Sequence, residues 1–432
     1  MTEIAKITVG GFTNIEKVTL TLQDITGLLS LNNYGKSNVF KAISFGLNFI
    51  QKDSNYKLNL MHKRENIPLC NTIAGKDFEF EITVELNDHS SIIYGFSFAW
   101  QQDNSPSFIT AEYLRVRLSK EKKYISCIKR DRETCYYLSS PKGRCNTPLI
   151  IENHQLAINK LSNYDKLHYI SYIKEVLQLK VFEINSLADP KSFFKDSDEE
   201  SNYSFLELDV KKNVTIPAPD DLSRFLFHLM KEDKKKYNLF IDAITQLLPD
   251  ISYLKPRKIE IKKSPFQTSE SVPYTFSEAI YSVSVQDRHL NQELSINRLS
   301  DGSKRILYVI LMAIAVDKAG VNLLMVEELE NSIHPSLFQK LLIVLKTFAD
   351  KTKILFTSHS PYLIQYIKPE MLYIGLPAGD GVARFLKFRK SKTKAFYKEA
   401  EDYGLSSGDY LFDLLIQDSE TRKEKEKAFF EI

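Results

Sequence analysis

A short polar segment between two apolar ones constrains the fold of this 432-residue chain more than any other feature. The segment is SLNNYGKSN, residues 30–38. An apolar run, residues 25–31, leads into it, and apolar residues at helical spacing follow it from Val39 to Leu47. A strand, a loop and a helix in this order let backbone N–H groups face the oxygens of a phosphate. The match to the usual pattern G-x-x-x-x-G-K-[ST] is incomplete, because Ser30 stands where the first glycine is expected.

Three residues of this segment have roles that follow from the pattern. Gly35 tolerates the unusual backbone dihedrals that such a loop needs before its lysine. We expect Lys36 to reach the β- and γ-phosphates of a nucleotide and Ser37 to place its hydroxyl on Mg²⁺. Ser30 is small enough for the corner between strand and loop, and its Cβ conflicts with that corner only if the backbone there needs a positive φ.

Two adjacent carboxylates follow a second buried strand, residues 322–326. Carboxylates at the end of such a strand are costly unless they meet a cation or a ligand. We expect Glu327 to hold Mg²⁺, directly or through water, and Glu328 to polarise the water that attacks a γ-phosphate. The alternative is a pair of solvated, helix-capping carboxylates, which the apolar strand before them disfavours.

Two further features are weaker on their own. The segment LSDGS, residues 299–303, opens a strongly apolar helix and is either a second anion-binding corner or simply a capped helix start. His359, in TSHSP, follows the strand of residues 354–356. It is either a structural histidine or a group at the sheet edge where ligands bind.

In this order, the four features resemble the heads of ABC-type ATPases, over about residues 4–50 and 280–376. The chain is most similar to the branch that contains RecF, SMC and OLD proteins. The segments that carry this similarity are GFTNIEKVTLTL, NNYGKSN, LSDGS and ELENSIHP.

The resemblance implies that ATP is sandwiched between two copies of the chain. Ser300 and Gly302 of one copy would close on the γ-phosphate that Lys36 of the other holds, and His359 would sense that phosphate. The asparagines of the loop join the nucleotide-binding residues by the same resemblance: Asn32, Asn33 and Asn38. Two residues depart from the family pattern, Ser30 and Glu327, the latter being one methylene longer than the usual aspartate.

The fold class expected is α/β. The resemblance implies an ABC-type P-loop head, with a mixed or parallel sheet and flanking helices, into which a β-meander and a helical arm are inserted. Alternating residues 78–152 predict the meander, and continuous apolar strands between helices predict the parallel sheet. Residues 1–150 would form the N-terminal lobe with the phosphate loop, residues 151–265 the helical arm, and residues 266–432 the C-terminal lobe. We also expect an exposed loop or a mobile segment at residues 189–202 and a helix after His359.

The composition limits the cellular compartments and the kinds of partner that we expect. No apolar run reaches the ~18–20 residues of a membrane span, and the start of the chain has no secretory pattern. The four cysteines form no C-x-x-C pair, so we expect reduced thiols and a cytoplasmic protein. A net charge of +3 neither demands nor excludes nucleic acid. Basic runs at residues 231–236, 255–263 and 384–394 could contact phosphates, although such runs are more typical of solvated faces.

The spacing of the features selects among functions. About 260 residues separate Ser37 from Leu299, too few for the long coiled coils of SMC proteins. About 70 residues follow His359, fewer than the ~100 that an appended nuclease domain of the OLD type needs. We therefore expect an ATPase that oligomerises around ATP and Mg²⁺. It would serve as the sensor or scaffold subunit of an anti-phage defence system with a separately encoded effector. A RecF-like repair ATPase acting on double-stranded DNA and a nucleotide-gated scaffold with little turnover are the alternatives.

Overall fold

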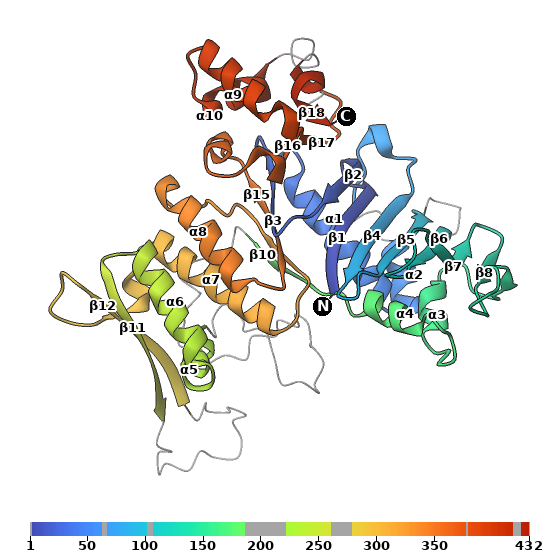
Figure 1. Ribbon diagram of the computed structural model, residues 1–432, viewed down its shortest axis with the longest axis horizontal. Helices are drawn as coiled ribbons and strands as arrows, with labels where there is room; N and C mark the ends of the chain where they lie inside the picture. The colour runs from blue at the N-terminus through green and yellow to red at the C-terminus, as the bar shows by residue number, and fades with distance from the viewer. Residues whose placement is uncertain are drawn as a thin grey trace, which may run out of the picture. The chain divides into compact units, whose positions relative to one another are not determined.

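The computed structural model describes residues 2–62, 67–101, 107–185, 222–260, 279–376, 379–417 and 425–431 (Figure 1). The chain forms two compact units, and each consists of separate stretches of sequence. The first unit contains Met1–Glu183, Val321–Leu329 and Lys351–Ile432. The second contains Ile184–Gly320 and Glu330–Asp350. The predicted loop at residues 189–202 lies outside the described residues.

An eight-stranded antiparallel sheet forms one part of the first unit, in the order β2-β1-β4-β5-β6-β7-β8-β9. Its strands are β1 (Thr2–Phe12), β2 (Ile15–Thr21), β4 (Phe78–Leu86), β5 (Ser91–Ala99), β6 (Phe108–Arg117), β7 (Ile125–Arg130), β8 (Cys135–Tyr137) and β9 (Thr147–Pro148). The predicted meander is confirmed. The sheet is larger than expected, because the hairpin β1–β2 joins it through the pairing of β1 with β4.

Helices pack against this sheet and share one hydrophobic core with it. They are α1 (Lys36–Gln51), α2 (Ser54–His62), α3 (Ala157–Leu161) and α4 (Ile170–Leu177), and a short 3-10 turn, η2 (Asn71–Ile73), follows α2. Aromatic rings from α1 and the sheet pack together, with the ring of Phe49 stacked at 5.0 Å on both Phe96 and Phe98. Glu112 is buried beneath α3 and accepts hydrogen bonds from the backbone N–H groups of Ala157 (2.6 Å) and Ile158 (2.9 Å). This carboxylate therefore caps the helix that follows the meander.

A second sheet completes the first unit, in the order β10-β14-β15-β3-β16-β17-β18. Its strands are β10 (Val181–Ile184), β14 (Leu323–Val326), β15 (Lys353–Ser358), β3 (Ile25–Ser30), β16 (Leu372–Gly375), β17 (Phe385–Phe388) and β18 (Phe430–Glu431). The pairs β14–β15, β15–β3 and β3–β16 are parallel, and β17 and β18 extend the sheet in antiparallel fashion. All residues of β3 and β14 are buried, as expected of strands covered on both faces. The predicted mixed or parallel sheet and the α/β fold class are confirmed.

The chain after His359 differs from the sequence prediction. Instead of an α-helix it forms two 3-10 turns, η6 (Pro361–Gln365) and η7 (Pro369–Met371). Pro369 disfavours the helical conformation of Lys368, so the segment that starts at Pro361 is too short for a stable α-helix. Beyond β17 come η8 (Lys390–Lys392), α9 (Thr393–Asp402) and α10 (Ser407–Ile416), drawn in red in Figure 1.

The described residues of the second unit form two pairs of helices and a small sheet. Its elements are α5 (Leu222–Glu232), α6 (Lys234–Leu247), β11 (Ile251–Glu260), β12 (Ala279–Asp287), β13 (Leu294–Ser295), η5 (Ile296–Arg298), α7 (Asp301–Lys318) and α8 (Pro335–Phe348). Asp233 separates α5 from α6 and caps the latter by accepting from the N–H of Lys236 at 3.0 Å. In α7 every residue from Lys304 to Asp317 is buried, which is typical of a helix inside a core.

Two expectations from composition can be examined directly. All four cysteines are free thiols, and burial raises the pKa of both Cys127 and Cys135 to about 12. These two thiols are therefore poor nucleophiles at neutral pH. Across the described ranges, no helix combines the length and apolar character that crossing a membrane requires.

Candidate functional site

Three neighbouring parallel strands bring the predicted site residues of the first unit to one sheet edge. Leu29 of β3 pairs with Ser358 of β15, and Val326 of β14 pairs with Phe356 of β15. The chain leaves these strands at the same edge, as the loop after Ser30, as Glu327 and Glu328 after β14, and as His359 after β15. Ligands of parallel sheets bind beyond the carboxyl ends of the strands.

The loop after β3 has the backbone shape that its sequence suggested. Asn33 has a φ of 57° and Gly35 a φ of 126°. Asparagine tolerates the left-handed region better than most residues. A Cβ on Gly35 would lie 2.8 Å from Oδ1 of Asn14 and 2.9 Å from Cβ of Ala383, so both its dihedral and its surroundings require glycine.

Ser30 fits the corner between strand and loop. It is the last residue of β3, is fully buried, and is not among the residues with a positive φ. Its Oγ donates to the carbonyl of Leu31 at 3.2 Å. The departure from glycine therefore introduces no backbone strain.

Lys36 is buried and lies over the loop. Its Nζ donates to the carbonyl oxygens of Ser30 and Leu31, both at 2.9 Å, and lies 3.4 Å from Oγ of Ser30. The ammonium group is thus held at the start of the loop, where it can exchange a carbonyl partner for a phosphate oxygen.

The start of α1 is suited to an anion. Its N-cap is Gly35, which has no side chain that could cap the helix, and its first turn contains no acidic residue. The unpaired N–H groups of a first turn and the helix dipole favour negative charge. Ser37, Asn32 and Asn33 are exposed beside it, so a phosphate and an oxygen-liganded cation have donors and a hydroxyl within the loop.

Asn38 has a structural partner that the sequence did not reveal. Its Nδ2 donates to Oδ1 of Asn14 at 2.9 Å, and Nδ2 of Asn14 donates to the carbonyl of Tyr34 at 2.9 Å. The amide of Asn14 thus ties the start of α1 to the loop. The segment GFTN was noted for its resemblance to a family motif, but its role depends on contacts between residues 24 positions apart.

The two acids after β14 are half-buried, and the backbone of the second one is unusual. Glu328 has a φ of 45°, and its N–H donates to Oγ1 of Thr357 at 2.9 Å. The next residue, Leu329, donates its N–H to the carbonyl of Thr357 at 3.3 Å. Non-glycine residues in this conformation are costly and cluster at functional sites. The neighbouring strand β15 therefore fixes the direction in which the chain leaves Glu327.

A third carboxylate lies near Glu327 and was missed by the sequence analysis. Glu183 is part of β10, the neighbour of β14, and accepts a hydrogen bond from Oγ of Ser44 at 3.3 Å. Burial, and then the charge of Glu327, raise the pKa of Glu183. A lone acid inside an apolar strand, as in VFEI, was the available clue. Among the described residues no group of three or more acids, histidines or cysteines is arranged to hold a metal by itself.

The predicted residues of the signature segment belong to the second unit. Ser300 is the N-cap of α7, with its Oγ accepting from the N–H of Ser303 at 3.2 Å. Asp301 in the first turn forms an ion pair of 2.8 Å with Lys304. The start of α7 is thus capped by a side chain, whereas the N-cap of α1 is a glycine. Gly302 lies against the loop after the acids, since a Cβ at this position would be 2.2 Å from the carbonyl oxygen of Ser332.

We expect Gly302→Ala to destabilise the second unit. The added methyl group would meet a backbone oxygen, which cannot turn away as a side chain can, and such overpacking costs about 1–3 kcal/mol. Thermal unfolding should show Tm lowered by several degrees. Gly75→Ala is the matched control, because its Cβ position has no contact within 4 Å among the described residues, apart from its two chain neighbours. Equal Tm values for the two variants would contradict the close packing of Gly302 on Ser332.

Comparison with known proteins gives the chain its family. No curated protein matches its sequence. It is similar to solved structures of SMC heads. The SMC head domain from Thermotoga maritima has 12% identity and a TM-score of 0.40, covering 90% of this chain and 99% of that one. The SMC head with an extended coiled coil, bound to the C-terminal domain of ScpA and derived from Pyrococcus furiosus, has 12% identity and a TM-score of 0.46, covering 93% and 100%. Residues 31–365 match the family described as "AAA domain, putative AbiEii toxin, Type IV TA system". Because this match spans more than half of the sequence, the chain belongs to that family of AAA domains.

Proposed function

We propose that the chain binds ATP with Mg²⁺ at the edge formed by β14, β15 and β3, and hydrolyses it. One observation carries most of this proposal: the buried Lys36 and the start of α1, whose N-cap is Gly35, lie at the same sheet edge as two consecutive carboxylates. A cation and a helix N-terminus beside acids can serve a phosphate and a metal ion together. A merely structural loop has no need of this combination.

Each residue then has a distinct task. The N–H groups around Gly35 and the ammonium of Lys36 bind the phosphates, with Asn32 and Asn33 at the exposed side of the loop. Bound Mg²⁺ would neutralise charge between the phosphates, and Ser37 and Glu327 would hold it. Asn38 supports the loop through Asn14.

Hydrolysis needs a base near the γ-phosphate, and we assign this task to Glu328. Its backbone N–H is held by Oγ1 of Thr357, and the residue is half-buried at the end of β14. His359 follows the next strand and is exposed. We assign it to contact with the γ-phosphate. Both tasks depend on position and electrostatics rather than on covalent chemistry.

The active form is an oligomer of this chain. By the resemblance to ABC-type heads, Ser300 and Gly302 of a second copy would complete the site. The lobes proposed from the sequence, residues 1–150, 151–265 and 266–432, remain our functional division.

We assign the protein to the cytoplasm, as the sensor or scaffold subunit of an anti-phage defence system whose effector is a separate protein. The printed name of its family, which includes a toxin of a toxin–antitoxin system, supports the defence setting. Two other functions stay open on specific grounds. A RecF-like repair ATPase is favoured by the exposed basic residues Lys390, Lys392 and Lys394. A nucleotide-gated scaffold is favoured by Glu327, which is longer than the usual aspartate.

Steady-state ATP hydrolysis, with and without double-stranded DNA, distinguishes these functions when the particle mass is measured in parallel. We expect slow turnover that DNA leaves unchanged, in an oligomer that forms with ATP. Turnover stimulated several-fold by DNA would replace this proposal with the repair ATPase. Oligomerisation on ATP without turnover would replace it with the scaffold.

A further inference from the structure

We propose that Tyr34 is a positioning residue that ties the phosphate loop to residues 379–384, the segment that precedes β17. The inference rests on the proposed function, since it concerns how the same loop is kept ready for nucleotide. Tyr34 occupies a position of the motif that accepts any residue, so the motif itself assigns it no task.

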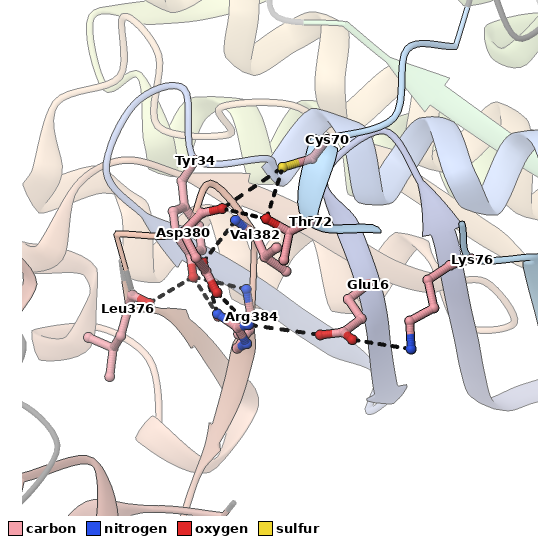
Figure 2. Close-up of polar contacts among 9 residues, drawn as sticks. All are labelled: Glu16, Tyr34, Cys70, Thr72, Lys76, Leu376, Asp380, Val382 and Arg384. Atoms are coloured by element: carbon pink, nitrogen blue, oxygen red, sulfur yellow. Dashed lines mark hydrogen bonds and ion pairs between the residues drawn. The ribbon is translucent and has the colours of Figure 1, made fainter. Parts of the chain in front are cut away.

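The hydroxyl of Tyr34 is the centre of the connection (Figure 2). It donates to the carbonyl of Leu376 at 2.8 Å, with the carbonyl of Arg384 at 3.1 Å as a second acceptor. It also accepts from the N–H of Arg384 at 2.9 Å. One side chain of the loop therefore satisfies backbone groups at both ends of the connection between β16 and β17.

The ring of Tyr34 is also fixed, by packing contacts with two neighbouring residues. It packs edge-to-face on Phe385, with the centroids 5.5 Å apart. Gly375 leaves room for the ring, because a Cβ at this position would lie 2.5 Å from Cε1 of Tyr34. Burial is the main cause that raises the pKa of Tyr34, so the phenol stays protonated and can donate.

The segment that receives Tyr34 is itself anchored (Figure 2). Arg384 forms a two-pronged ion pair with Asp380, at 3.1 and 2.7 Å, and lies 3.8 Å from Glu16, which in turn pairs with Lys76 at 3.6 Å. Thr72 donates to the carbonyl of Asp380 at 3.2 Å. The segment is thereby fixed to β2 and to the stretch that follows α2.

A second connection, through Asn14, also links residues 379–384 to the phosphate loop. The N–H of Ala383 donates to the carbonyl of Asn14 at 2.9 Å, and Asn14 holds the carbonyl of Tyr34 through its side chain at 2.9 Å. The segment, the β1–β2 turn and the loop thus form a closed set of contacts around Gly35. Such a set keeps the loop in one shape before a ligand arrives, and a preorganised site loses less conformational entropy on binding.

The consequence is specific to nucleotide affinity. Tyr34 directs its hydroxyl into the segment, so its removal should not change the reacting groups. Tyr34→Phe keeps the ring packing and removes only the hydroxyl. Because a net hydrogen bond changes an equilibrium by roughly 2- to 13-fold, we expect MgADP to bind about 3- to 10-fold more weakly, with kcat at saturating ATP within about twofold of wild type.

The experiment is calorimetric titration of the full-length protein with MgADP, which binds the loop but is not hydrolysed. Tyr373→Phe is the matched control, because it removes a buried tyrosine hydroxyl of the sheet that contains β3, one that accepts from the N–H of Thr21 in β2 at 2.7 Å. Arg384→Gln removes the ion pair with Asp380 and keeps the backbone of residue 384, which bonds with the hydroxyl of Tyr34. Arg257→Gln is its control, since that arginine pairs at 2.5 Å with Glu293 in the second unit and is about equally exposed.

We expect weaker binding for Tyr34→Phe and Arg384→Gln, unchanged binding for both controls, and a double variant no weaker than Tyr34→Phe, because the two changes loosen one connection. If Tyr34→Phe binds MgADP like wild type, or no more weakly than Tyr373→Phe, the inference is wrong. Fully additive losses in the double variant would also overturn it. If wild type itself binds no MgADP, the proposed function fails instead, so the two failures can be told apart.

Discussion

Lys36→Ala is expected to abolish nucleotide binding. The ammonium is the buried cation of the loop, and removing one partner of a buried, hydrogen-bonded charge pair costs about 2–5 kcal/mol, or at least ~30-fold in affinity. The measurement is titration with MgADP and MgATP, and we expect no saturation at concentrations that fill the wild-type site.

The control for this variant is another buried lysine of the same unit. Lys57 donates to the carbonyl of Lys52 and to Oδ1 of Asn159, and burial lowers its pKa to about 8. Lys57→Met should reduce stability and leave nucleotide affinity unchanged. If Lys36→Ala still binds nucleotide within about threefold of wild type, or if Lys57→Met weakens binding equally, the loop after β3 is not the nucleotide site.

Local patterns were enough to predict the strands and the loop that carry the site. The apolar runs around residues 25–31 and 322–326 identified β3 and β14 because buried parallel strands are apolar throughout. The loop was identifiable because Gly35 and Lys36 occur at a fixed spacing between a strand and a helix. Both inferences use residues close together in sequence.

Contacts between distant residues could not be predicted in this way. The Asn14–Asn38 bond depends on how the β1–β2 turn meets α1, and Glu183 lies near Glu327 only because β10 pairs beside β14. The conformation at Ser30 was likewise undecided by the sequence. It follows from the register of β3 with β16, in which Ser30 pairs with Gly375. The prediction of a helix after His359 was wrong for a local reason. It relied on the spacing of apolar residues and did not take into account that Pro369 disfavours the helical conformation of the residue before it.

Glu328→Gln is expected to keep nucleotide binding and slow hydrolysis by at least about 100-fold, the lower range for losing a general base. Glutamine has the same size and shape as glutamate. It should therefore adopt the φ of 45° at this position as glutamate does, and the backbone hydrogen bond to Thr357 should persist. ATP then stays intact in the site, and the ATP-bound oligomer should accumulate. Single-turnover hydrolysis and particle mass with MgATP measure the two effects.

Variants of two other glutamates show whether the effect is specific to Glu328. Glu85→Gln, which alters a partly exposed ion pair of 3.5 Å with Arg117 on the meander, should behave like wild type. Glu327→Gln should instead weaken the dependence of binding on Mg²⁺, because we assign Glu327 to the metal rather than to the attacking water. Hydrolysis at the wild-type rate by Glu328→Gln would show that this residue is not the base. Loss of turnover in Glu327→Gln alone, with Mg²⁺ affinity unchanged, would transfer the catalytic role to the first of the two carboxylates.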